Sequence, residues 1–275
     1  MITDEFHLGK IDKEAFGDLG CFVGGYVGAY FTLCNVILLF ITFRDYRKAY
    51  TKQSFETHFF ELLKMHRENV SELQIEVKTE IKVEKGRKVF VLLYREFRFI
   101  LQAIEDIESS FSNEDKCIIA YCCLYYGTGR NSTRLLKNAL SHYDKNEFVN
   151  KLLDKIKNYF EQLDPIENED KKWIKHELFG GHITRLRHLF LHLYETFNYV
   201  DTNCTDTNEK EKYFKIIRAQ LSLHEQTLLL FHSISHISGK WSKDILLNYN
   251  IAQNFPLDFV DSEKVLDIKK LFNLD

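Results

Sequence analysis

The sequence predicts a mainly α-helical protein, with one N-terminal transmembrane helix followed by a cytosolic α-helical bundle. Three observations support this fold class. An uncharged apolar run lies near the N-terminus, apolar residues recur at helical spacing over much of the remaining chain, and only two prolines, Pro165 and Pro256, occur in 275 residues. Because proline in a helix interior costs about 3 kcal/mol, its scarcity favours long helices. Hydrophobic residues make up 45% of the chain, which is enough to build a core.

The uncharged run extends from Leu19 to Phe43. A helix of that length measures about 37 Å and can cross a hydrocarbon core of about 30 Å. The charged residues before it are mostly acidic, whereas a cleaved secretory signal has a basic leader, so we expect no cleavage. Arg44, Arg47 and Lys48 follow the run, and the positive-inside rule places them in the cytoplasm. The predicted parts are a short leader (1–18), a transmembrane helix (19–43) and a cytosolic helical domain (44–275).

A stripe of small residues runs along the predicted membrane helix, because Gly20, Gly24 and Gly28 recur every four residues. Such stripes let membrane helices approach each other closely. The membrane and a second copy of the chain are therefore the expected partners. Glycine is also common in membrane helices in general, so the stripe is equally compatible with no interface.

The rest of the chain shows helical spacing with one interruption. A helix is expected through Phe55 to Val70, and the period-two pattern from Leu73 to Val83 predicts a short hairpin or exposed strand. Helical spacing returns after Gly86. A further helix starts at the capping pair Ser112 and Asp115 and stops near Gly127. The remaining expectations are helices at Asn146–Leu163, Ile183–Val200, Lys210–His236 and after a cap at Asp261 or Ser262, with a connecting loop at Asp201–Glu209.

Charge and cysteine usage exclude several functional classes. The 37 basic and 40 acidic side chains nearly balance, so bulk charge does not indicate a DNA-binding protein. The six cysteines show no CxxC pair, zinc spacing or disulfide framework, and we interpret them as reduced thiols. We predict no cofactor and no metal. His188 and His192 lie four residues apart, but the glutamate of a zincin motif is missing.

Two predicted helices carry stripes of polar residues. Arg185, His188, His192 and Glu195 lie along one face of the first helix, and Arg218, Ser222 and Glu225 lie along one face of the second. The stripes meet if the helices pack antiparallel. Arginine would then hold a phosphate while histidine moves a proton. A buried network that fixes the helix register explains the same residues equally well. The candidate catalytic residues are Arg185, Arg187, His188, His192, Arg218 and Glu225.

Five segments carry a resemblance to a known family: GDLGCFVGGYVG, SFETHFFELLKMHRENV, GRKVFVLLYREF, LFGGHITRLRHLFLHLYETFNYVD and, most clearly, YFKIIRAQLSLHEQTLLLFHSIS. With these segments the chain resembles the phage abortive infection (AbiC-like) membrane protein family of bacteria. The family reads GHYFRHLY where this chain reads RHLFLHLY, so Arg187, Leu189 and Leu191 depart from it. The resemblance implies an antiphage role at the bacterial inner (plasma) membrane. An infected cell would stop growing or die before phage is released.

A second resemblance concerns a short motif. Arg187, His188 and His192 fit the arginine, polar residue, three residues, histidine pattern of HEPN ribonucleases, which are helical bundles and often defence toxins. Arg218 and His224 fit a looser spacing of the same pattern. This resemblance implies metal-independent RNA cleavage, with RNA or a phage-derived trigger as a partner. The alternative is a non-enzymatic protein that perturbs the membrane as an oligomer or senses infection through an interaction module.

Overall fold

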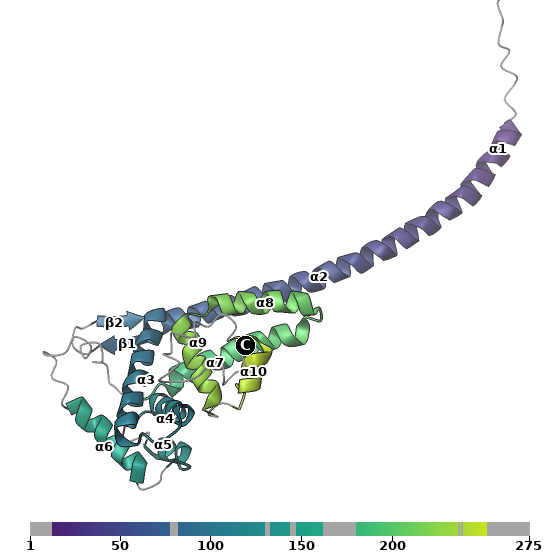
Figure 1. The fold of residues 1–275 in the computed structure, drawn as a ribbon. Helices are drawn as coiled ribbons and strands as arrows, with labels where there is room; N and C mark the ends of the chain where they lie inside the picture. The colour runs from purple at the N-terminus through teal and green to yellow at the C-terminus, as the bar shows by residue number, and fades with distance from the viewer. Residues whose placement is uncertain are drawn as a thin grey trace, which may run out of the picture. The chain divides into compact units, whose positions relative to one another are not determined.

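The computed structural model describes residues 13–77, 82–129, 133–143, 147–161, 180–235, 237 and 239–251. Backbone contacts divide the chain into two compact units, Met1–His58 and Phe59–Asp275. Helices make up most of the described residues in both units (Figure 1). The mainly α-helical fold class predicted from the sequence is confirmed.

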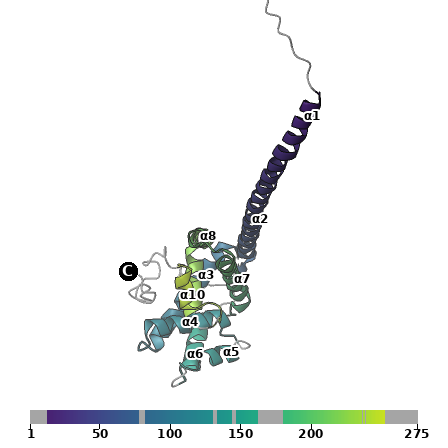
Figure 2. The same ribbon diagram turned by 90° about the vertical axis from the view of Figure 1, so that its right-hand side faces the viewer.

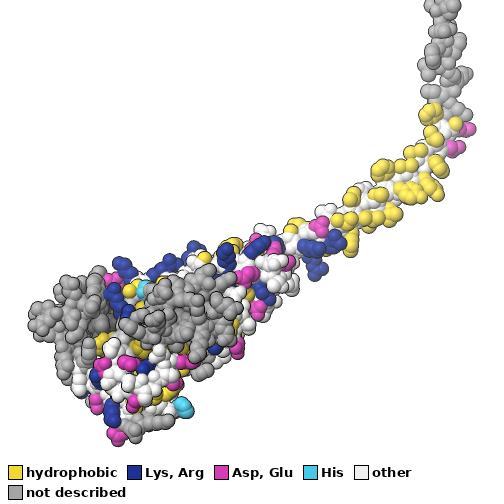
Figure 3. Space-filling view, viewed as in Figure 1, with side chains coloured by type: hydrophobic (Ala, Val, Ile, Leu, Met, Phe, Trp, Pro, Cys, Tyr) yellow, Lys and Arg dark blue, Asp and Glu magenta, His cyan; other side chains and the backbone are white. Residues whose placement is uncertain are grey.

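The first unit is a helix with exposed apolar side chains. α1 (Lys13–Phe22), a π-helical turn (Val23–Val27) and α2 (Gly28–Glu72) follow one another directly. Figure 3 shows hydrophobic side chains covering the helix between an acidic and a basic patch, and Phe40 is 71% exposed. Within the described part of the chain, this helix alone is long and apolar enough to cross a membrane. Signal sequences and buried core helices can share those properties, but the apolar stretch here is not buried.

The second unit begins with the last turns of α2, from Phe59, and continues into a hairpin. β1 (Gln74–Val77) pairs antiparallel with β2 (Lys82–Lys85), and the register runs from Gln74↔Lys85 to Val77↔Lys82. The Ile75 side chain is buried, which agrees with the period-two pattern. The hairpin predicted between Leu73 and Val83 is confirmed.

The core of the second unit forms around α3 (Arg87–Ile107) and α4 (Asn113–Tyr126), which pack against each other. α3 buries one face, whereas α4 is buried on nearly all sides from Lys116 to Tyr125. The Ser112 hydroxyl accepts a hydrogen bond from the backbone N–H of Asp115, and α4 ends at Gly127. The predicted start and stop of this helix are therefore confirmed.

The remaining helices surround that pair. They are α5 (Thr133–Ala139), α6 (Phe148–Glu161), α7 (Ile183–Asn203), α8 (Thr207–Gln220), α9 (Leu223–Ile234) and α10 (Lys243–Asn248). α9 packs on α3, α4 and α10, while α7 packs on α4 and α8. Figures 1 and 2 both show α5 and α6 at the end of this unit away from α8. Aromatic contacts join the layers, among them the stacked rings of Phe97 and Phe231, 4.1 Å between centroids.

The single helix predicted from Lys210 to His236 is wrong. α8 ends at Gln220, and Ser222 begins α9 by accepting a hydrogen bond from the N–H of Glu225, whose carboxylate accepts one from the N–H of Ser222. This reciprocal capping box satisfies two backbone donors that a helix start leaves without intrahelical partners. Arg218 therefore lies on a different helix from Glu225, and the polar face predicted for them does not exist.

Other boundaries also differ from the prediction. α7 continues to Asn203, and α8 starts at Thr207 after the N-cap Asp206, so the loop expected at Asp201–Glu209 is much shorter. The sequence did not predict α5 or α10, which are seven and six residues long. The helix expected after Asp261 or Ser262 lies outside the described residues.

Candidate functional site

The entry to α7 is fixed by a glycine and a buried histidine–glutamate contact. Gly181 has φ +83°, and the backbone N–H of the next residue, His182, donates to the carbonyls of Leu124 and Tyr125 at the end of α4. The imidazole of His182 lies 3.1 Å from the Glu96 carboxylate of α3, and both side chains are buried. These contacts attach the start of α7 to two core helices.

The guanidinium of Arg185, one of the predicted catalytic residues, adjoins this pair. Its Nη1 lies 3.5 Å from Nδ1 of His182. Arg185 is partly buried and lies in the first turn of α7. Arg185 therefore contacts the ring nitrogen of His182 that faces away from Glu96.

The other end of the polar stripe meets the last turns of α2. The His192 Nε2–H donates to the Leu62 carbonyl at 3.1 Å, and the His192 ring stacks on His66 with 6.3 Å between centroids. Burial lowers the pKa of His192, and the Leu62 carbonyl partly offsets this effect. His192 is therefore part of a packed contact between α7 and α2.

His66 also reaches α9. Its Nε2 lies 3.0 Å from Oε1 of Glu225, with the two side chains 3% and 0% exposed. The distance is that of an ion pair, but the two atoms are not aligned as a hydrogen bond. We define the His66 cluster as His66, His192 and Glu225; it brings two predicted site residues together through one that sequence reasoning missed.

Arg218 makes a separate set of contacts. Its Nη1 donates to the Tyr249 carbonyl at 2.9 Å, and its Nη2 lies 2.6 Å from the Glu211 carboxylate. Arg218 is buried. It thus joins α8 to the segment after α10, and its observed partners give it a structural role.

Arg187 and His188 are exposed on α7. Arg187 lines a pocket of about 340 Å³, which we call the Arg187 pocket, whereas His188 is not among the residues lining it. Arg187 and His192 are five residues apart, so their directions on the helix differ by about 140°. The structure therefore places the arginine and the second histidine of the HEPN-like pattern in different surroundings. The pocket is lined by Tyr125, Arg187, Leu191, His232, Ile237, Gly239 and Lys240.

The Arg187 pocket combines two cations with neutral hydrogen-bonding groups. Burial lowers the pKa of His232 to about 4, and its Nδ1 lies 3.1 Å from the Tyr121 hydroxyl. Burial also raises the pKa of Tyr125 to about 12, against the opposing effect of the Arg187 charge. At neutral pH the positive charge therefore comes from Arg187 and Lys240, and such a pocket suits an anionic or polar group.

Sequence reasoning missed His66, His182 and Lys240. His66 lies on the same helical face as Phe59, Leu63 and Val70, all of which are buried. Its spacing from these apolar residues in the sequence therefore indicates that it points into the core. Its partner Glu225 is far away in the sequence, and only the tertiary fold reveals that contact.

Metal or thiol chemistry finds no support in the described residues. They contain no group of three or more histidine, cysteine or acidic side chains arranged to hold a metal ion. Burial raises the pKa of the Cys117 and Cys122 thiols to about 12, so neither forms the reactive thiolate at neutral pH. Packing accounts for these cysteines.

Comparison with known proteins bears on the segment that holds most of these contacts. Residues 181–260 match the model of the family described as "Putative phage abortive infection protein". The predicted AbiC-like resemblance is confirmed over that segment. It contains both arginines of α7, His192, Arg218 and Glu225. No curated protein and no solved structure matches the chain.

Proposed function

We propose that this protein acts in phage abortive infection, anchored in the bacterial inner membrane by the helix that precedes its helical domain. The observation that carries the proposal is the family match over residues 181–260. That segment supplies α7 to α10, and residues of α7, of α9 and of the connection after α9 line the Arg187 pocket. The exposed apolar helix of the first unit supports the anchoring.

The first prediction concerns topology. Arg44, Arg47 and Lys48 follow the apolar stretch on α2, and the positive-inside rule puts them in the cytoplasm. A reporter fused after Asp275 should therefore give the cytoplasmic signal, with alkaline phosphatase inactive and a fluorescent protein bright. An active phosphatase fusion in intact cells would contradict the charge argument.

The second prediction concerns self-association in the membrane. An added Cβ at Gly24 or Gly28 meets nothing within 4 Å in the described single chain, so leucine at both positions does not disturb the helix by clashes of its own. Bulky side chains would hold two copies apart, since small residues permit close helix contact. We expect Gly24→Leu with Gly28→Leu to reduce crosslinked dimer several-fold. Leucine at Ala29 is the matched control, and equal crosslinking in all variants would exclude the stripe as an interface.

Within the helical domain, the Arg187 pocket is the best candidate for contact with a target. Arg187 is exposed on the rim, whereas Arg218 and Glu225 are buried. Lys240 is positioned beside the pocket by Glu195, 3.4 Å away, and by the Tyr194 ring, 4.9 Å from its Nζ. Arginine and lysine at an open pocket suit recognition of a phosphate or carboxylate.

The third prediction tests this assignment. Arg187→Ala should leave membrane abundance near the native level, because the side chain is exposed, and should raise plaque counts at least tenfold. Arg98→Ala, which removes an exposed arginine from α3, is the matched control and should protect normally. If Arg187→Ala protects as well as the native chain, the pocket is not the functional site.

RNA cleavage is a second candidate chemistry. The exposed positions of both Arg187 and His188 support it, because both can reach an external phosphate. His232, which lies in the pocket, has a pKa of about 4 and is a poor proton donor at pH 7. A ribonuclease would therefore depend on His188. Detergent-purified native protein and His188→Ala, incubated with cellular RNA, separate this candidate from a binding function.

A further inference from the structure

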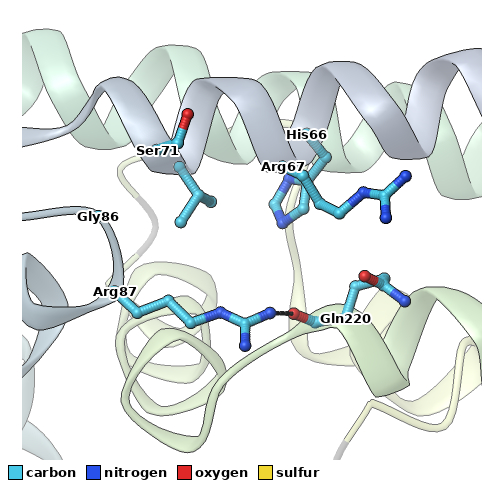
Figure 4. Close-up of a pocket in the computed structure, with 7 residues that line it drawn as sticks. His66, Arg67, Ser71, Gly86, Arg87 and Gln220 are labelled. Carbon is cyan, nitrogen blue, oxygen red and sulfur yellow. Dashed lines mark hydrogen bonds between the residues drawn. The ribbon is translucent and has the colours of Figure 1, made fainter.

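A second pocket borders the His66 cluster, because His66 lines it. It has a volume of about 290 Å³ and is formed where the last turns of α2 meet the start of α3 and the end of α8 (Figure 4). None of the residues that line it is acidic. The side chains and backbone that matter for its chemistry belong to His66, Arg67, Ser71, Gly86, Arg87 and Gln220.

His66 gives this pocket a buried polar wall. The side chain is 3% exposed, and its Nδ1 has no hydrogen-bond partner among the described residues. Figure 4 shows the ring extending from α2 into the space above Arg87 and Gln220. Buried polar atoms are nearly always hydrogen-bonded in proteins, so a ligand that accepts a hydrogen bond from Nδ1–H would complete the site.

Glu225 fixes which edge of the ring is available. Its Oε1 lies 3.0 Å from Nε2 of His66, so the carboxylate occupies the opposite edge from Nδ1. The stacked His192 ring covers one face of His66. The ring can therefore face Glu225 with its Nε2 and present Nδ1–H to a ligand.

Two arginines supply positive charge. The Arg87 Nη2 donates to the Gln220 carbonyl at 2.9 Å, which holds its guanidinium across the pocket, and Arg67 projects from α2 beside His66 (Figure 4). α3 also begins here at Gly86, without a side-chain cap. The N-terminus of a long helix favours an anion, and guanidinium groups pair with phosphate oxygens.

We propose that this pocket binds the phosphate group of a small phosphate ester, held by Arg67, Arg87 and the Nδ1–H of His66. A pocket of this volume is at the small end of ligand sites, so it accommodates a phosphate with a compact substituent. The chain's formal net charge of −3 argues against attraction of nucleic acid by bulk charge. The proposal involves binding only and is independent of the Arg187 pocket.

Titration calorimetry on the full-length protein in detergent tests this, with inorganic phosphate and AMP as separate probes. We expect saturable binding by the native protein, weakened at least tenfold in Arg67→Ala and abolished in Arg67→Ala with Arg87→Ala. Lys64→Ala is the matched control: it removes one positive charge from the same helix, where Lys64 pairs with Glu68, and does not line the pocket. It should bind like the native protein.

Three results would overturn the proposal. The first is no heat of binding from either probe up to millimolar concentration, with the helix content of the native protein intact. The second is an equal loss of affinity in Arg67→Ala and Lys64→Ala, which would mean unspecific charge attraction. The third is binding of phosphatidic acid in mixed micelles without binding of phosphate or AMP, which would show that the two arginines bind a lipid headgroup instead.

Discussion

Replacing Gly181 with alanine is expected to unfold or deplete the protein. Gly181 has φ +83°, and an added Cβ would lie 2.6 Å from the carbonyl carbon of Tyr126 and 2.9 Å from the N atom of Gly127. The close atoms are all backbone, so a side-chain rearrangement cannot relieve the clash. Backbone strain of this kind costs about 1 to 3 kcal/mol, and overpacking adds about 1 to 3 kcal/mol. We expect the free energy of unfolding to fall by about 2 to 6 kcal/mol, the sum of the two contributions.

Thermal unfolding of detergent-purified protein, followed by circular dichroism, measures this effect. Gly129→Ala is the matched control, because nothing lies within 4 Å of its added Cβ and its φ is not positive. The control should unfold at nearly the native temperature. An unchanged unfolding temperature for Gly181→Ala would show that the entry to α7 is not held against α4 as described.

The second large effect is expected for Glu225→Ala. The carboxylate is fully buried, caps the start of α9 and lies against His66. Removing one partner of a buried polar contact leaves the other unsatisfied at a cost of about 1 to 3 kcal/mol, and loss of a helix cap costs about 1 kcal/mol. Membrane abundance and phage protection should therefore fall together.

Glu68→Ala is the control for that variant. Glu68 is an exposed partner of Lys64, and surface pairs contribute at most about 1 kcal/mol, so its abundance should stay near normal. A well-folded, abundant Glu225→Ala protein without protection would instead favour the catalytic role that the sequence suggested. Protection that returns when growth at lower temperature restores the protein would support the structural role.

The sequence predicted those elements whose pattern is local. Apolar spacing identified α3 and α7, and the period-two run identified the hairpin of β1 and β2. The break before α9 was missed because Ser222 and Glu225, a capping pair, lie inside a continuous apolar pattern. Apolar periodicity shows which residues face the core. It continues across the turn between α8 and α9, although the helix itself is interrupted there.

The candidate site was predicted less well for a physical reason. His192 and Glu225 do lie in one cluster, but they meet through His66, which is distant from both in the sequence. Arg187 lines a pocket with His232 and Lys240 that no single helical face encodes. A contact between elements depends on how they pack, and local spacing carries no direct record of that.

The central claim, that this chain is an abortive infection protein, is tested most directly by infecting cells that express it. Phage yield per infected cell and survival of infected cells are measured together at high multiplicity, across a panel of phages, against cells carrying an empty vector. We expect at least one phage to lose at least tenfold in yield while its infected cells still fail to form colonies. If every phage gave the same yield as in empty-vector cells, with the full-length protein abundant in the membrane fraction, the account would be contradicted.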